Sequence, residues 1–341
     1  MAVGTGHVRR CLSLVATIRQ KGGHCVFLTR QGPHNLANEI RAAGCDVRFV
    51  LDEDVISDWE TDAKASIAAI EDLGAAWLVV DSYALDARWQ RKVRPHVLRI
   101  MAIDDLANRP HDADLLLDQT FGRNETDYSD HISPGCTQLL GSDFTLLRPG
   151  FRALRSQSIA RRGELQNIAS VLVSTGGGDD GGITLEIVEQ LAQLPSRMRP
   201  HIKVIIPKTV PSFAAVSEIV NGISGGADLY EAVSDMEVHM AAADFAFGAG
   251  GTTSWERCCL GLPAAVIVTA ENQVFLADCL QEVGAVSLID RTKRDSLWVG
   301  NILENLNSNM HEYHRMVSAA ADICDGLGAD RVVLAMEESN V

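Results

Sequence analysis

Short apolar runs recur along the chain and alternate with Ala-rich stretches of helical character, and this alternation strongly limits the possible folds. Residues 77–80 and 264–268 are two such runs, and neither is interrupted by a polar residue. Runs of this kind are typical of strands buried on both faces, as in parallel sheets covered by helices. Hydrophobic residues make up 46% of the chain and aromatic residues only 5%, which fits such packing. The pattern predicts an α/β fold.

The length of the chain predicts two domains, because 341 residues exceed the size of an ordinary single domain. Segment 121–149 is rich in Gly, Ser and Pro, which favours a loop-rich boundary, and segment 169–174 starts the strand-and-helix alternation again. We therefore predict domains at residues 1–149 and 150–341. Two domains imply a cleft in which a small ligand can bind.

Polar residues follow two of the predicted buried strands. Asp81 and Tyr83 come directly after one apolar run, and Asp104 and Asp105 come after the next. Residues at the carboxyl ends of parallel strands line the ligand crevice of such sheets. These four side chains are therefore candidates for a binding or catalytic site.

The opening stretch carries a histidine at a position that faces ligands in many α/β proteins. Gly4 and Gly6 permit a tight turn, and the apolar residues that follow have helical spacing, so His7 is predicted at the mouth of a helix. A helix N-terminus suits phosphate and disfavours the imidazolium form, which leaves a neutral imidazole able to accept a proton. The alternative is an ordinary strand-to-helix turn whose histidine caps the helix or faces water.

A second glycine-rich turn lies in the predicted C-terminal domain. The strand near 245–247 leads into segment 248–253, Gly-Ala-Gly-Gly-Thr-Thr, and a helix predicted from Ser254 carries Glu256 in its first turn. Such a loop can hold a diphosphate while a carboxylate takes both ribose hydroxyls. The alternative is an acid that merely favours the helix dipole. Segment 174–179 is a weaker nucleotide-loop signal, because aspartates follow its glycines.

The charge of the chain excludes some partners. With a formal net charge of -15, the protein lacks the broad basic surface that nucleic acid or an anionic membrane requires, and we expect neither as a partner. An anionic small molecule would have to be held locally by backbone amides, helix dipoles and a few arginines.

Cysteine and histidine usage gives no strong metal or redox signal. The eight cysteines include no Cys-x-x-Cys pair, and the sequence shows no signal-peptide pattern or long apolar run, so we expect a reducing, cytoplasmic location. Cys258 and Cys259 could be redox-active, but two buried thiols on a helix are favoured. His311 and His314 could chelate a metal, but a solvated helix face is favoured.

Several motifs occur in an order that resembles a known family, the UDP-2,4-diacetamido-2,4,6-trideoxy-β-L-altropyranose hydrolase of pseudaminic acid biosynthesis and its relatives. The resemblance spans most of the chain. The motifs are Gly-Thr-Gly-His-Val-x-Arg-Cys-Leu at 4–12, Val-Asp-Ser-Tyr at 80–83, Ile-Asp-Asp-Leu-Ala-Asn-Arg at 103–109, Leu-Leu-Arg-Pro at 146–149, Gly-Gly-Thr-Thr-Ser-Trp-Glu at 250–256 and Asn-Gln at 272–273.

The resemblance implies a fold like that of the B-type glycosyltransferases (GT-B), with two Rossmann-like domains that face each other across a cleft. It implies that His7 is the base that activates water for inverting attack at the anomeric carbon, which releases UDP without a metal or cofactor. The implied substrate-binding residues are Gly4, Gly6, Tyr83, Arg148, Asn272 and Gln273. The implied nucleotide-binding residues are Gly177, Gly250, Gly251, Thr252, Thr253 and Glu256, the last on the ribose.

One departure from the family pattern concerns the N-terminus. Members normally have a first strand before the Gly-x-Gly-His turn, whereas here Met1 lies three residues before Gly4. Without that strand the N-terminal sheet lacks a central member. We expect that translation starts upstream; the alternative is a domain that closes differently.

The predicted mechanism needs a group that orients His7, and a carboxylate such as Asp104 or Asp105 is the hypothesis. Two other functions stay open. The same base in a glycosyltransferase would deprotonate a sugar or lipid hydroxyl, although no apolar and basic stretch typical of membrane-acting transferases is present in the N-terminal half. The second open function is that of a non-catalytic protein that senses nucleotide sugars. We expect a UDP-sugar as ligand and a monomer or weak homo-oligomer.

Overall fold

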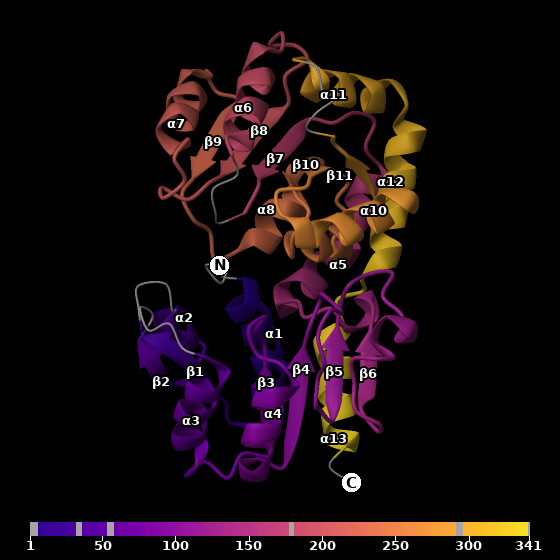
Figure 1. The fold of residues 1–341 in the computed structure, drawn as a ribbon. Helices are drawn as coiled ribbons and strands as arrows, with labels where there is room; N and C mark the ends of the chain where they lie inside the picture. The colour runs from indigo at the N-terminus through magenta and orange to yellow at the C-terminus, as the bar shows by residue number, and fades with distance from the viewer. Residues whose placement is uncertain (1–5, 32–35, 53–57, 177–180, 291–295, 340–341) are drawn as a thin grey trace. The chain divides into compact units, whose positions relative to one another are not determined.

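The computed structural model describes residues 6–31, 36–52, 58–176, 181–290 and 296–339 (Figure 1). The chain divides into two compact units, one formed by Met1–Arg148 with Leu327–Val341 and the other by Pro149–Gly326. Every pairing between the strands is parallel, which confirms the predicted α/β class. The predicted boundary after residue 149 lies one residue beyond the observed one, and segment 327–341, predicted in the second domain, belongs to the first unit.

The strands of the first unit form a two-stranded sheet of order β1-β2 and a four-stranded sheet of order β3-β4-β5-β6. The strands are β1 (Val26–Gln31), β2 (Asp46–Asp52), β3 (Trp77–Val80), β4 (Arg99–Ile103), β5 (Leu115–Asp118) and β6 (Thr137–Leu140). The helices are α1 (Gly6–Gln20), α2 (Ala37–Ala42), α3 (Trp59–Ile70), α4 (Ala87–Val93), η1 (Arg94–His96), η2 (Glu125–Tyr128), η3 (Ser142–Phe144) and α13 (Gly328–Glu338).

Helix α1 packs against both sheets of the first unit. Leu14 belongs to the cluster that contains Met101 of β4, whereas its neighbour Val15 packs with Ile40 of α2 and Cys45. Within the described ranges no strand pairs with both β1 and β3, so the two sheets are joined through the side chains of α1 and not through a ladder. This two-sided packing holds the first turn of α1, which carries His7, at a defined place.

Helix α13 packs on the first unit because it has one continuous apolar face. Ala329, Val332, Val333 and Met336 recur at three- and four-residue spacing and lie in the same cluster as Leu14. The backbone of Gly328 passes so close to η3 that a β-carbon there would lie 2.3 Å from the carbonyl oxygen of Thr145. The apolar periodicity predicts that this helix packs against a core, but it does not say which of the two units provides that core.

We expect Gly328→Ala to loosen α13 from the first unit. The added methyl group would collide with backbone atoms of Phe144 and Thr145, which cannot rotate away as a flexible side chain could. Overpacking of this kind lowers the free energy of unfolding by about 2 kcal/mol, or about 6 °C in Tm. The control is Gly163→Ala, where nothing lies within 4 Å of the added carbon. Equal melting temperatures of the two variants in a calorimetric scan would refute the close packing.

The second unit has one six-stranded sheet of order β12-β11-β10-β7-β8-β9. Its strands are β7 (Ser170–Ser174), β8 (His201–Ile205), β9 (Ala227–Tyr230), β10 (Phe245–Ala249), β11 (Ala264–Ile267) and β12 (Val286–Leu288). This is the order of doubly wound dinucleotide-binding sheets. In such sheets the second and third strands are added on one side of the first strand, and the fourth to sixth strands on its other side, so the strand order reverses between the first and fourth strands. The reversal here falls between β7 and β10, and ligands of such sheets bind at the carboxyl ends of these strands.

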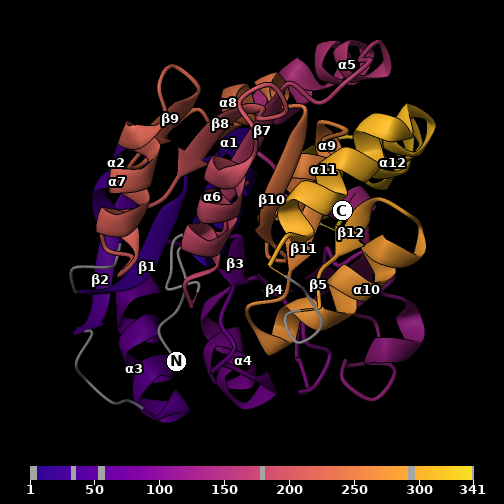
Figure 2. The same cartoon turned by 90° about the horizontal axis from the view of Figure 1, so that it is seen from above.

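In the second unit α6 contacts α7 and α11, α5 contacts α8, α9 and α12, and α11 and α12 contact each other (Figure 2). The helices are α5 (Pro149–Gly163), α6 (Ile183–Gln193), α7 (Phe213–Gly222), α8 (Met236–Ala242), α9 (Thr253–Cys259), η4 (Glu271–Gln273), α10 (Val274–Glu282), α11 (Trp298–Ser308) and α12 (Met310–Ile323). Phe245 and Phe247 of the central strand β10 are fully buried, and the Phe247 ring meets Trp298 edge to face at 5.8 Å. The core therefore fixes β10 and the turn that follows it.

Candidate functional site

His7 and Asp81 form a close pair in the first unit. His7 lies in the first turn of α1, and Asp81 follows the last residue of β3. The Nδ1 atom of His7 is 2.5 Å from Oδ1 of Asp81, and the two side chains are 14% and 6% exposed. The pair is thus largely shielded from solvent, with the histidine the more accessible partner.

Arg10 holds the Asp81 carboxylate from the same face of α1. Its Nε donates to Oδ2 of Asp81 at 2.6 Å and its Nη2 to Oδ1 at 2.5 Å, which is a bidentate arrangement. Its Nη1 donates to Oδ2 of Asp105 at 3.0 Å. Arg10 thereby connects the carboxyl ends of β3 and β4. Sequence reasoning missed this residue, although its position three residues after His7 places both on one helix face.

Tyr83 and Asp105 complete the cluster. The Tyr83 hydroxyl donates to Oδ2 of Asp105 at 3.0 Å, and the Tyr83 ring meets the His7 ring edge to face with centroids 4.8 Å apart. The other Asp105 oxygen, Oδ1, is buried and makes no hydrogen bond to any described residue. The structure therefore brings His7 and Tyr83 together at the ends of neighbouring strands.

The hypothesis that Asp104 or Asp105 orients His7 is wrong in this structure, because Asp81 occupies that position. Asp105 reaches the cluster through Arg10. Asp104 is fully buried elsewhere and accepts hydrogen bonds from the Tyr128 hydroxyl and the Ala107 amide. Successive residues of an extended chain point in opposite directions, so only one of two adjacent aspartates can face α1.

Asp81 is ionised at neutral pH. Burial by itself raises the pKa of this carboxyl. The charge and hydrogen bonds of Arg10, together with the hydrogen bond to His7, outweigh burial and lower the pKa to about 2. Asp81 therefore presents a fixed negative charge to the imidazole over the whole physiological pH range.

In the second unit, the turn after β10 packs against η4. A β-carbon at Gly250 would lie 3.3 Å from Cβ of Gln273, and one at Gly251 would lie 3.6 Å from its Nε2 atom. The Gln273 side chain is itself fixed, because its Oε1 accepts a hydrogen bond from the Thr269 amide at 3.1 Å. The glycines thus allow the turn and the glutamine to approach closely.

The remaining predicted residues are spread over both units. Gly6 is the first residue of α1, and Arg148 is the last residue of the first unit before α5. Gly4 and Gly177 lie outside the described residues. The predicted nucleotide and sugar residues of the second unit are Thr252 before α9, Thr253 and Glu256 in its first turn, and the exposed Asn272 beside Gln273 in η4.

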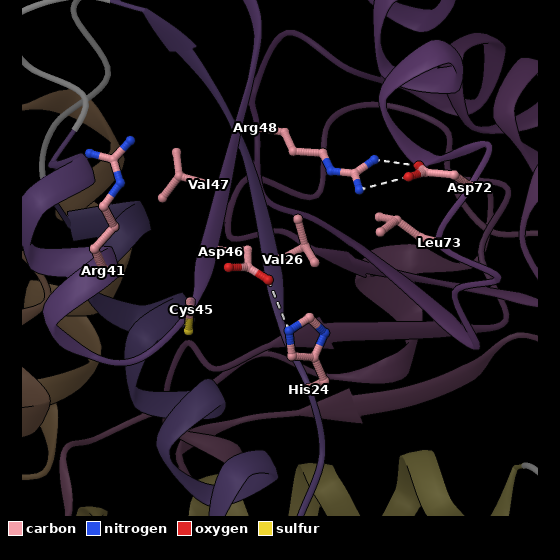
Figure 3. A pocket seen from close by; sticks show the side chains of 9 residues that line it. All are labelled: His24, Val26, Arg41, Cys45, Asp46, Val47, Arg48, Asp72 and Leu73. Atoms are coloured by element: carbon pink, nitrogen blue, oxygen red, sulfur yellow. Dashed lines mark hydrogen bonds and ion pairs between the residues drawn. The ribbon is translucent and has the colours of Figure 1, made fainter.

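A surface hollow of about 640 Å³ lies elsewhere in the first unit (Figure 3). It includes His24 before β1 and Asp46 at the start of β2, so it lies at the amino ends of these strands. Two pairs lie within it, His24 with Asp46 at 3.0 Å and Arg48 with Asp72, and Arg41 also lines it. None of the predicted site residues lines this hollow, and ligands of parallel sheets bind at the opposite strand ends.

The described residues contain no group of three or more His, Cys, Asp or Glu side chains that could hold a metal ion. The Nε2 atom of His314 forms a hydrogen bond of 3.1 Å with the Leu165 carbonyl oxygen. Cys258 is buried, and burial raises the pKa of its thiol to about 12, which makes it unreactive. Across the described ranges, the helices are all too short or too polar to traverse a bilayer.

Comparison with solved structures identifies the fold. The chain matches MurG of Acinetobacter baumannii with a TM-score of 0.71 at 13% identity, covering 98% of this chain and 97% of that one. It matches the calicheamicin glycosyltransferase CalG4 with a TM-score of 0.64 at 16% identity, covering 98% and 96%. The chain has a GT-B type fold. At these identities the likeness to the GT-B proteins establishes the architecture of two Rossmann-like units and not an activity.

Two further comparisons concern a UDP complex and a polysaccharide biosynthesis protein. This GT-B chain matches the structure of S. aureus MnaA with UDP at a TM-score of 0.59 and 14% identity, covering 97% of this chain and 93% of that one. It is 26% identical over 145 residues to the spore coat polysaccharide biosynthesis protein SpsG of Bacillus subtilis (strain 168). That match covers 42% of this chain and about two fifths, 41%, of the relative. No family model matches the sequence.

Proposed function

We propose that the protein hydrolyses a UDP-linked 2,4-diacetamido-2,4,6-trideoxyhexose at the anomeric carbon with inversion and releases UDP. The observation that carries this proposal is the His7–Asp81 pair at the carboxyl end of β3. An ionised carboxylate that accepts a hydrogen bond from Nδ1–H leaves the lone pair of Nε2 available as a base. His7 is the more exposed partner of the pair, so its ring can reach a water molecule.

The reaction would proceed in one displacement. The oxygen of a water molecule bonds to the anomeric carbon while the bond from that carbon to the diphosphate oxygen breaks, and the bonding electrons leave with UDP. His7 Nε2 takes a proton from the attacking water and later returns it to solvent. Asp81 stabilises the imidazolium that forms, and Arg10 keeps the carboxylate in place. No acid is needed on the leaving group if its charge is stabilised where it binds.

The second unit would hold that leaving group. The turn of Gly250, Gly251, Thr252 and Thr253 lies at the end of β10, beside the point where the strand order reverses. Its amides would bind the diphosphate, and Glu256 would accept hydrogen bonds from the ribose hydroxyls.

The sugar would be bound by residues that the family resemblance assigns to it. These residues are Gly4, Gly6, Tyr83, Arg148, Asn272 and Gln273. The names of similar proteins support a nucleotide-sugar substrate, because one structure contains UDP and the curated relative is a polysaccharide biosynthesis protein. We further propose a cytoplasmic protein that acts as a monomer or weak homo-oligomer.

A glycosyltransferase is the second candidate, favoured by the fold shared with MurG and CalG4. The same His7–Asp81 pair would then deprotonate a hydroxyl of an acceptor in place of water. The chemistry at the anomeric carbon and the leaving group would be unchanged, so the two functions differ only in the nucleophile.

Release of UDP distinguishes these functions. We expect the purified protein to release UDP from UDP-2,4-diacetamido-2,4,6-trideoxyhexoses without any acceptor, measured by a coupled UDP assay, with the inverted anomer of the free sugar seen by NMR. Release that requires an added sugar or lipid acceptor would establish the transferase. Binding of UDP-sugars without release under either condition would show a sensor and refute the enzyme.

A further inference from the structure

Arg257 is a buried arginine beneath the turn that follows β10. Its side chain belongs to α9 and the residue is 3% exposed. Its Nη2 donates to the Ala249 carbonyl at 2.8 Å and to the Ser254 hydroxyl at 3.0 Å, and its Nη1 donates to the Thr253 hydroxyl at 3.3 Å. The guanidinium therefore joins the end of the strand to the start of the helix and spans the turn 250–253 from below.

Gly248 makes room for this guanidinium. A β-carbon at Gly248 would lie 2.7 Å from Nη1 of Arg257 and 2.7 Å from the carbonyl oxygen of Ser174. Ser174 is the last residue of β7, whereas Gly248 belongs to β10. Arg257 thus places its charge between the carboxyl ends of the two strands at which the sheet order reverses.

Among the described residues, no carboxylate lies within 4.0 Å of the Arg257 guanidinium, and none accepts a hydrogen bond from its Nε. Arg162 in α5 is a useful contrast, since it is also fully buried but donates to the carbonyls of Met240, Ala243 and Leu260. Burial lowers the pKa of each guanidinium to about 10, so both remain cations at neutral pH. The guanidinium of Arg162 is surrounded by hydrogen-bond acceptors, whereas that of Arg257 has an N–H group without an acceptor among the described residues.

A buried cation with incomplete partners is stabilised when an anion binds nearby. We propose that Arg257 is a positioning residue for the diphosphate of the nucleotide: it fixes the turn 250–253 and supplies positive charge beneath it. The identity of the nucleotide as UDP rests on the proposed function. Arg257 should therefore affect the affinity for phosphate groups, whereas a residue that only stabilises the fold would not act on the phosphates in particular.

Binding measurements on three variants test this role. Arg257→Gln removes the charge, Arg257→Lys keeps it, and Arg162→Lys is the control at another buried arginine of the same unit. Titration calorimetry gives the Kd for UDP and for inorganic pyrophosphate, and ligand-observed NMR gives that for uridine. Thermal melts establish that each variant is folded at the working temperature.

We expect Arg257→Gln to weaken UDP and pyrophosphate about 10- to 100-fold, with uridine unchanged. Arg257→Lys should lose less than about tenfold because it retains the charge, and Arg162→Lys should lower Tm without changing any Kd. Unchanged UDP binding in Arg257→Gln would overturn the inference. So would a parallel loss of UDP and uridine binding, or wild-type protein that binds neither UDP nor pyrophosphate.

The test of Arg257 can fail or succeed independently of the test of the proposed hydrolase function. Arg257-dependent binding of pyrophosphate by a protein that releases UDP from no UDP-sugar would support the role of Arg257 and refute the hydrolase. Conversely, UDP release with a Kd that does not depend on Arg257 would support the hydrolase and refute this inference alone.

Discussion

Replacement of His7 by Asn is expected to lower kcat for UDP release by about 10²- to 10⁴-fold and to leave the Kd for UDP within about twofold. General base assistance accounts for a factor of this size, and the asparagine amide cannot accept the proton of the attacking water. The nucleotide is assigned to the turn after β10 in the other unit, so its affinity should not depend on His7. Steady-state kinetics and titration calorimetry on the same preparations measure both quantities.

His24→Asn is the matched control for this experiment. His24 also belongs to the first unit and is paired with an aspartate, Asp46, at 3.0 Å, but the pair is exposed and lies at the amino ends of β1 and β2. The same substitution there should leave kcat unchanged. Full activity of His7→Asn would remove His7 from the mechanism, whereas an equal loss in both variants would indicate a general effect on folding.

The sequence predicted strands where an apolar run is continuous. The predicted run 77–80 is β3 as observed, and 245–247 lies within β10. The strands β6, β9 and β12 were not predicted; each lies at a sheet edge, as the predicted β3 also does. Most residues of β6, β9 and β12 are partly exposed, and polar residues interrupt their sequences, so these strands lack the continuous apolar run that made β3 recognisable.

The candidate site was predictable by position along the chain but not by direction of the side chains. Polar residues after β3 and β4 were expected at a ligand crevice, and the structure places Asp81, Tyr83 and Asp105 together with His7. Which aspartate turns toward α1 depends on the path of the backbone beyond each strand. Arg10 and Arg257 were not singled out, because an arginine on a helix is usually solvated and only the tertiary packing shows that these two are buried.

Asp81→Asn is expected to lower kcat by about 10²-fold or more with little change in the Kd for UDP. The amide can donate a hydrogen bond to Nδ1 of His7, which places the imidazole proton on Nε2 and removes the base. It also leaves Arg10 without its bidentate partner, so Tm should fall, and activity must be measured well below the melting temperature. The matched control is Asp46→Asn, which removes the carboxylate of the exposed His24 pair.

The same variant should alter the dependence of stability on pH. The pKa of Asp81 is lowered from 3.8 to about 2 in the folded protein, so its carboxylate contributes stability that is present above about pH 4 and is lost as the pH falls toward 2. The contribution is about 2 kcal/mol in all, and about half of it is lost between pH 5 and pH 3. Urea unfolding at these two pH values should therefore show a fall in the free energy of unfolding about 1 kcal/mol larger in the wild type than in Asp81→Asn. Equal falls in the two proteins would mean that Asp81 is not held as a buried carboxylate, and the orienting role assigned to it would then be lost, whatever the kinetics of the variant.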